Sequence, residues 1–179
     1  MTTAVIVDAV RSPLGKRNGR LKNWHPVDLA AEVMNSLIER TGVDPARIVF
    51  ARGLPRAQHL RRLQLADIAL DTRVCNGHTT TSDALWAGVP VVTLRGRHFA
   101  SRVSASCLHA VGLPELVTES LSDYEALAVK LAQDGGFLRA TRQKLMNNRL
   151  SQPLFDTARF TRNLERAYLR AWQQCQAGL

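Results

Sequence analysis

The chain has no long apolar run, few cysteines and no dense basic tract, and each absence excludes a class of protein. No stretch reaches the roughly 18 consecutive apolar residues of a membrane-spanning helix, so no membrane partner is predicted. Residues 1–20 carry several charges around a short apolar stretch, which does not predict a signal peptide. Cys75, Cys107 and Cys175 lie far apart, without the spacing of a metal or redox site. The cytoplasm is therefore the predicted location.

The composition is that of a basic globular domain. The 179 residues include 24 Lys and Arg against 15 Asp and Glu, a net charge of +9, and 45% of them are hydrophobic. Basic chains often bind nucleic acid, membranes or phosphorylated ligands. The cations here are mainly arginines scattered along helical patterns, not a dense run with interleaved aromatics. No nucleic-acid partner is predicted, and a phosphate-bearing ligand or a solvated surface is favoured.

Residues 1–48 have the pattern of a strand, a polar loop and a helix. The β-branched run at residues 4–7 predicts a buried strand, and apolar residues recur on one face from Pro26 until Gly42. The sequences AVIVDAVRSPLGKRNGRL and HPVDLAAEV in this segment resemble the amino terminus of the thiolases. A thiolase also needs a nucleophilic Cys, a His and a second Cys, and no later motif matches them. Acyl-CoA chemistry is therefore the least favoured function.

Residues 49–179 follow a different pattern, in which short apolar runs alternate with helical ones. Runs that predict strands lie at residues 48–51, 67–71 and 90–94. Stretches with helical periodicity follow them at residues 55–65, 101–111, 122–133, 136–147 and 157–174, with a further helix ending near Gly88. This alternation predicts an α/β fold with a parallel sheet, and only helices after Pro114. We predict that Trp86 and Phe99 are core or interface aromatics and that Tyr168 and Trp172 pack the last helix onto the lobe.

The segment with most chemistry is NGHTTTSD, residues 76–83, in a predicted strand-to-helix turn. Such turns lie at the carboxyl ends of parallel strands, where α/β folds bind ligands. The backbone N–H groups and hydroxyls of Thr79 and Thr80 would then point outward at a helix amino terminus, which favours a diphosphate. Asp83 could close a capping box with Thr80 or accept hydrogen bonds from ribose. His78 alone could be a turn residue or a ligand contact.

A wider set of motifs resembles the O-GlcNAc transferases of the bacterial type. The motifs are LPRAQHLRRLQLADIALDTRVCNGHTTTSDALWAGVPVVTL, then FASRVSAS, and SQPLFDTARFT near the end. The resemblance implies an incomplete Rossmann-like carboxyl-terminal lobe of a GT-B glycosyltransferase over residues 49–179, followed by helices. It implies that the ligand is UDP or UDP-GlcNAc, with no cofactor or metal, and that the acceptor is a protein.

The resemblance also implies a role for individual residues. Arg56 and His59 would lie beside the uracil and ribose. His78, Thr79 and Thr80 would hold the diphosphate, and Asp83 the ribose. Arg56 stands where animal members usually have Lys, and residues 81–82 depart from the Gly-Met found there. No catalytic residue is assigned, because the resemblance places the catalytic His in the first lobe.

Several expectations about the whole chain follow from the two resemblances. The phrase at residues 42–48 fits either family, so we predict a junction near residue 48 that arose by recombination or an assembly error. The first GT-B lobe and the tetratricopeptide repeats of the family are not expected in this sequence. A lobe without its counterpart is predicted to bind the donor without transferring sugar, and to self-associate through unpaired surface. The alternative is a non-enzymatic interaction module with a vestigial nucleotide site.

Overall fold

A computed structural model describes residue 23 and the ranges 26–49 and 51–178. Contacts divide the chain into two compact units, with the division between Gly53 and Leu54, a few residues after the predicted junction. The strand predicted at residues 4–7 lies outside the described residues. Each unit is described by itself.

The described residues of the earlier unit form one helix and one helical turn. α1, Pro26–Thr41, ends where Gly42 adopts a φ of 64°, and the Gly42 N–H donates to the carbonyl of Ile38 at 2.9 Å. The 3-10 turn η1, Pro45–Arg47, is capped by the Asp44 carboxylate, which accepts from the Ala46 N–H. The strand predicted at residues 48–51 is wrong for the three of those residues that the structure describes. Val49 is 84% exposed, so its apolar side chain has no packing that would hold a strand.

The later unit has a small parallel sheet with the order β1-β2-β3. Its strands are β1 (Ala69–Leu70), β2 (Val91–Leu94) and β3 (Val117–Thr118). Ala69 pairs with Val91, and Thr93 with Val117. The parallel sheet was predicted, but β3 corrects the prediction of helices alone after Pro114. Two residues are too few to give the alternating pattern from which a strand is recognised.

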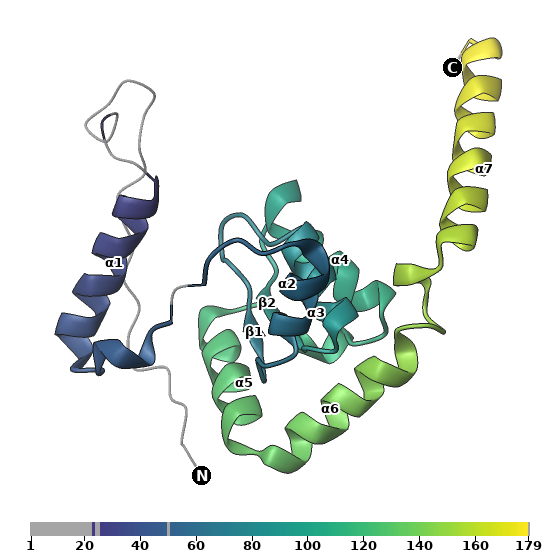
Figure 1. Ribbon diagram of the computed structural model, residues 1–179. Coiled ribbons are helices and arrows are strands. Elements are labelled where there is room, and N and C mark those ends of the chain that lie inside the picture. The colour runs from purple at the N-terminus through teal and green to yellow at the C-terminus, as the bar shows by residue number, and fades with distance from the viewer. Residues whose placement is uncertain (1–22, 24–25, 50, 179) are drawn as a thin grey trace. The chain divides into compact units, whose positions relative to one another are not determined.

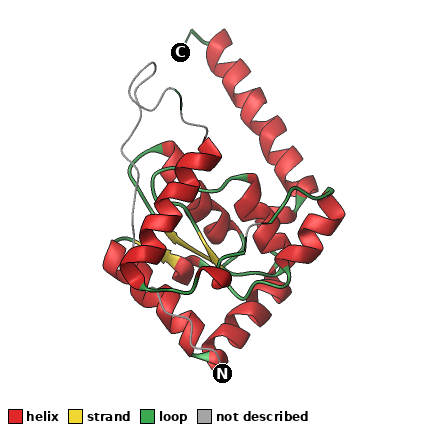
Figure 2. Ribbon diagram, turned by 60° about the vertical axis from the view of Figure 1, so that its left-hand side comes forward, coloured by secondary structure: helices red, strands yellow, loops and turns green. Residues whose placement is uncertain are grey.

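Helices make up most of the rest of this unit, and α3, α4 and α5 all pack against β2 (Figure 1). The α-helices are α2 (Arg56–Leu63), α3 (Thr79–Ala87), α4 (Val103–Ala110), α5 (Leu121–Gln133), α6 (Gly135–Asn148) and α7 (Thr157–Gln176). The 3-10 turns are η2 (Phe99–Ser101), η3 (Pro114–Leu116) and η4 (Pro153–Phe155). Figure 2 shows the short strands enclosed by helices. The core lies between the sheet and the helices around it, where Leu85, Val92, Leu108, Leu131 and Leu145 are all fully buried.

Side chains of α6 and the residue after it join the helix to earlier elements. The Lys144 ammonium lies 2.6 Å from the Glu115 carboxylate. Arg149 donates to the carbonyl of Trp86 at 2.6 Å, and its guanidinium lies 5.0 Å from the centre of the Trp86 ring. Trp86 is still 40% exposed, so a core position is wrong and an interface position stays a prediction. Cation–π contacts of this kind stabilise by about 0.5–1 kcal/mol at exposed sites.

The last helix, α7, carries an exposed apolar stripe and has no buried residue. Phe160, Leu164, Tyr168 and Trp172 recur every four residues and are 63%, 39%, 68% and 62% exposed. Residues at this spacing share one face of a helix. The prediction that Tyr168 and Trp172 pack α7 onto the lobe is therefore wrong, because both side chains are mostly exposed in the described part of the chain. Among the described residues, no helix combines the length and apolar character needed to cross a bilayer.

Candidate functional site

The amino terminus of α3 presents free hydrogen-bond donors beside the carboxyl edge of the sheet. His78 is the N-cap and makes no side-chain capping bond. The first main-chain bond of the helix runs from the Ser82 N–H to the His78 carbonyl, at 3.1 Å. The N–H groups of Thr79, Thr80 and residue 81 therefore precede the helical ladder. His78, Thr79 and Thr80 are exposed, so their donors are open to a ligand.

The turn before α3 is held by the carboxylate of Asp71, which directly follows β1. One Asp71 oxygen accepts from the Gly77 N–H at 2.7 Å, and the other accepts from the Thr93 hydroxyl at 2.5 Å. Because Thr93 belongs to β2, Asp71 ties the turn to two strands at once. The sequence analysis did not select Asp71. Asp71 stands six residues before Gly77 in the sequence, and only the folded turn brings its carboxylate to the Gly77 N–H.

Buried hydroxyls fix the other side of the same turn. The Thr81 and Ser104 hydroxyl oxygens lie 2.8 Å apart, and Ser104 donates to the Gly77 carbonyl at 3.0 Å. A methyl group on Gly77 would lie 2.5 Å from the Thr80 hydroxyl and 2.6 Å from the Thr81 hydroxyl. Glycine is therefore required here by close approach. A small cavity of about 130 Å³ between β1 and α3 is lined in part by Asp71, Thr80 and Thr81.

Asp83 pairs with Arg56, which joins α3 to α2. The Arg56 guanidinium lies 3.4 Å from the Asp83 carboxylate, a long contact. The Asp83 side chain is 13% exposed, whereas that of Arg56 is 77% exposed. The capping box between Asp83 and Thr80, which the sequence left open, does not form, because α3 begins at Thr79 with no side-chain cap.

The two histidines of the predicted site have different neighbours. The Nδ1 atom of His59 lies 3.1 Å from an Arg62 nitrogen on the same helix. The ring of His78 meets that of Phe99 edge to face, with the ring centres 6.2 Å apart. Phe99 is 80% exposed and lies on the surface beside His78, so a core position is wrong and an interface position stays a prediction. The structure thus joins Arg56 to Asp83, and groups His78 with Thr79 and Thr80.

Asp71 also affects two groups that lie near it. Burial, and then the negative charge of Asp71, raise the pKa of Tyr124 to about 12. The Tyr124 hydroxyl donates to the Asp71 main-chain carbonyl at 3.0 Å, a bond that needs the neutral phenol. The same two causes, in the same order, raise the pKa of the Cys107 thiol. Both groups stay protonated near neutral pH, so Cys107 is an unreactive thiol.

Comparison with known proteins places this arrangement in a family. Residues 25–164 match the sequence model described as Glycosyl transferase family 41. The chain belongs to this family. It is 42% identical over 142 residues to a UDP-N-acetylglucosamine–peptide N-acetylglucosaminyltransferase of Caenorhabditis elegans, an alignment that covers 79% of this chain and 12% of the relative. It is 46% identical over 132 residues to a probable enzyme of the same name, SEC, from Arabidopsis thaliana, covering 73% of this chain and 14% of the relative.

A solved structure confirms the predicted fold of this glycosyltransferase family 41 member. A mutant O-GlcNAc transferase from Thermobaculum terrenum superposes with a TM-score of 0.76 and 38% identity, over 87% of this chain and 30% of the neighbour. The predicted Rossmann-like lobe of a GT-B O-GlcNAc transferase is therefore confirmed. The chain spans 12–14% of the length of the two relatives above. The family match begins at residue 25 and so includes α1, part of the segment that resembles thiolases. The thiolase resemblance and the junction near residue 48 remain predictions.

Proposed function

We propose that this chain is the donor-binding part of an O-GlcNAc transferase-like glycosyltransferase and that it binds UDP-GlcNAc at the amino terminus of α3. The observation that carries the proposal is the group of open donors at that terminus: the main-chain N–H groups of Thr79 and Thr80, which precede the first helical bond, and the exposed side chains of His78, Thr79 and Thr80. The names of the two relatives describe transfer of N-acetylglucosamine from a UDP-linked donor to a peptide.

The chemistry of this terminus suits a diphosphate. Aligned peptide dipoles give a helix amino terminus about half a positive charge, which favours a bound anion. Each hydrogen bond from a hydroxyl or N–H group to a charged oxygen contributes about 1.5–3 kcal/mol. In sugar transfer the bond between the sugar and UDP breaks and the electron pair stays on the diphosphate. Donors already aimed at that oxygen would stabilise UDP as it leaves.

Asp83 and α2 would bind the nucleoside. The Asp83 carboxylate can accept hydrogen bonds from ribose hydroxyls, but Arg56 now lies against it at 3.4 Å. Because Arg56 is highly exposed and the contact is long, little free energy is needed to move it aside. Arg56 and His59 would then lie beside the uracil and ribose. Arg62, which contacts His59, would fix the orientation of its ring.

Transfer is proposed to need more of the fold than this lobe. The chain covers 30% of its structural neighbour, and no residue of this site is assigned as a general base or nucleophile. We therefore expect the 179-residue chain to bind UDP-GlcNAc without measurable transfer to a protein acceptor.

Calorimetric titration with UDP tests the proposal. The unaltered chain, Asp83→Ala and Asp67→Ala are compared, because the last makes the same charge change at an 80% exposed side chain of an ion pair with Arg142. UDP binding that Asp83→Ala weakens and Asp67→Ala does not is the expected result. If the folded chain bound no UDP, the proposed donor site would be wrong, and a non-enzymatic interaction module would be the favoured function.

A further inference from the structure

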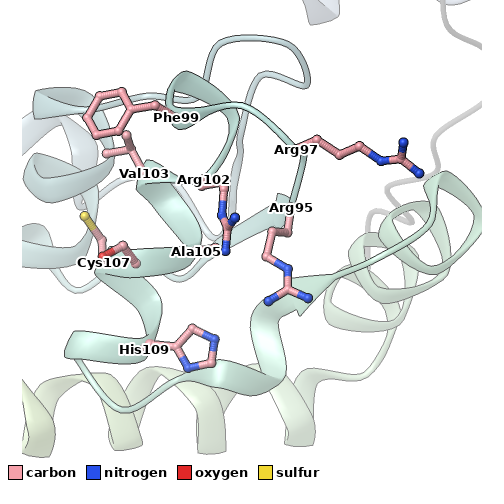
Figure 3. Close-up of a pocket in the computed structure, with 9 residues that line it drawn as sticks. Arg95, Arg97, Phe99, Arg102, Val103, Ala105, Cys107 and His109 are labelled. Atoms are coloured by element: carbon pink, nitrogen blue, oxygen red, sulfur yellow. The ribbon is translucent and has the colours of Figure 1, made fainter.

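A second cavity is lined by Phe99, whose ring contacts that of His78, and it is strongly basic. It encloses about 710 Å³ and is formed by the chain after β2, by η2 and by α4 (Figure 3). Its lining includes Arg95, Arg97, Arg102 and His109. From residue 94 to residue 110 the sequence has no Asp or Glu. The positive charge is therefore not neutralised by the segment that carries it.

Only part of this charge is neutralised by other elements. The Arg95 guanidinium makes two contacts with the Glu119 carboxylate, at 2.8 and 3.2 Å. Within the part of the chain that the structure describes, the side chains of Arg97 and Arg102 have no hydrogen-bond or ion-pair partner. A guanidinium offers five donors in a fixed plane and is suited to carboxylates or phosphates. The residues that line the cavity therefore include two arginines with unpaired side chains.

The directions of the side chains favour an extended ligand over a compact anion. Figure 3 shows that Arg95 and Arg102 point toward the space near His109, whereas Arg97 points away from it. A single phosphate held between Arg95 and Arg102 would leave the outward-pointing Arg97 without a contact. A chain with several spaced carboxylates can reach Arg97 as well, because it runs from the cavity to the outer arginine.

The floor of the cavity is apolar, which suits a polypeptide. Phe99, Val103, Ala105 and Cys107 line it, and Phe99 is 80% exposed. The Cys107 thiol is neutral and adds apolar surface. Exposed aromatic and Arg side chains together are typical of surfaces that bind proteins. An acidic peptide with apolar residues among its carboxylates could pack on the apolar floor and pair with the arginines at the same time.

We propose that this cavity, the arginine pocket, binds an acidic segment of the protein acceptor. The contact between Phe99 and His78 places the pocket beside the proposed diphosphate site, where an acceptor must lie. The identity of the polypeptide as the acceptor rests on the proposed function. The binding of an acidic polypeptide rests on the pocket alone.

Fluorescence anisotropy with a labelled peptide tests the proposal. The peptide alternates Asp and Glu with Leu and Phe, and its control has Asn and Gln in place of the acids. We expect the acidic peptide to bind the 179-residue chain and Arg102→Gln to weaken it at least about tenfold, as loss of one hydrogen bond to a charged group would. Arg97→Gln should weaken binding in the same direction. Arg139→Gln is the matched control, an exposed arginine on α6.

Three results would overturn the proposal. If Arg139→Gln lowered the affinity for the acidic peptide as much as Arg102→Gln does, the peptide would be attracted by the net charge alone. If the amide peptide bound as tightly as the acidic one, the carboxylates would not contribute to binding. Displacement of the peptide by UDP would make the pocket part of the nucleotide site. If UDP does not bind but the peptide and its variants behave as expected, the acceptor assignment fails with the proposed function, and the acidic-peptide site stands.

Discussion

Substitution of Gly77 by Ala tests whether the turn before α3 is as tightly packed as its geometry indicates. The new methyl group would lie 2.5 and 2.6 Å from the hydroxyls of Thr80 and Thr81, and 3.3 Å from the Thr81 nitrogen. Thr81 is only 4% exposed and is bonded to Ser104, so it cannot turn away without breaking that bond. The main chain of the turn must therefore shift.

The cost follows from two terms. An extra methyl group in a tightly packed site costs about 1–3 kcal/mol. Breaking the bond between Thr81 and Ser104 adds about 1 kcal/mol. Gly77→Ala should thus lower the free energy of unfolding by about 2–4 kcal/mol. The shift would also move the donors of Thr79 and Thr80, so UDP affinity should fall in molecules that remain folded.

Urea denaturation measures the free energy, with Gly53→Ala as the control. Gly53 has no atom within 4 Å of the position its Cβ would take, so its substitution should change stability by less than about 0.5 kcal/mol. If Gly77→Ala were as stable as Gly53→Ala, the close packing of the turn would be refuted.

Three further substitutions test the core, the tyrosine and the last helix. Leu145→Ala, at a fully buried position, should lower the free energy of unfolding by about 2–5 kcal/mol. Leu150→Ala, at a 78% exposed position, should lower it by less than about 0.5 kcal/mol. Equal losses of stability in urea denaturation would contradict the assigned core. The raised pKa of Tyr124 stabilises the fold fully below pH 10.0, and this stability is lost as pH rises from 10.0 to about 12. Between pH 10.0 and about 12 the free energy of unfolding should therefore fall less in Tyr124→Phe than in the unaltered chain. An identical fall in the two proteins would refute the raised pKa of Tyr124. The stripe on α7 should cause concentration-dependent self-association in sedimentation velocity, which Trp172→Gln weakens; a monomer at all concentrations would contradict this.

The helices and the main strand could be predicted from sequence because each has a clear local signal. α1 begins at Pro26 and ends just before Gly42, and the apolar run of β2 is flanked by turn residues. β3 has only two residues and is held by pairing with β2, a contact that local periodicity does not encode. The run at residues 48–51 has the composition of a strand, but the described structure gives it no strand to pair with.

The candidate site was predictable in part for a similar reason. The donors at Thr79 and Thr80 follow from a glycine-containing turn before a helix, which is a local pattern. Asp71 was missed because its carboxylate acts across the turn and the neighbouring strand. The pairing of Arg56 with Asp83 joins residues on two helices, and no spacing in the sequence indicates it.

The central claim is that the α3 terminus binds the diphosphate of a UDP-sugar, and parallel titration with UDP and uridine tests it most directly. The two ligands share the base and ribose and differ in the diphosphate. We predict that UDP binds at least about tenfold more tightly than uridine, and that Thr80→Val removes much of this difference because it deletes one hydroxyl donor. Equal affinity for the two ligands, in a chain shown to be folded, would contradict the claim.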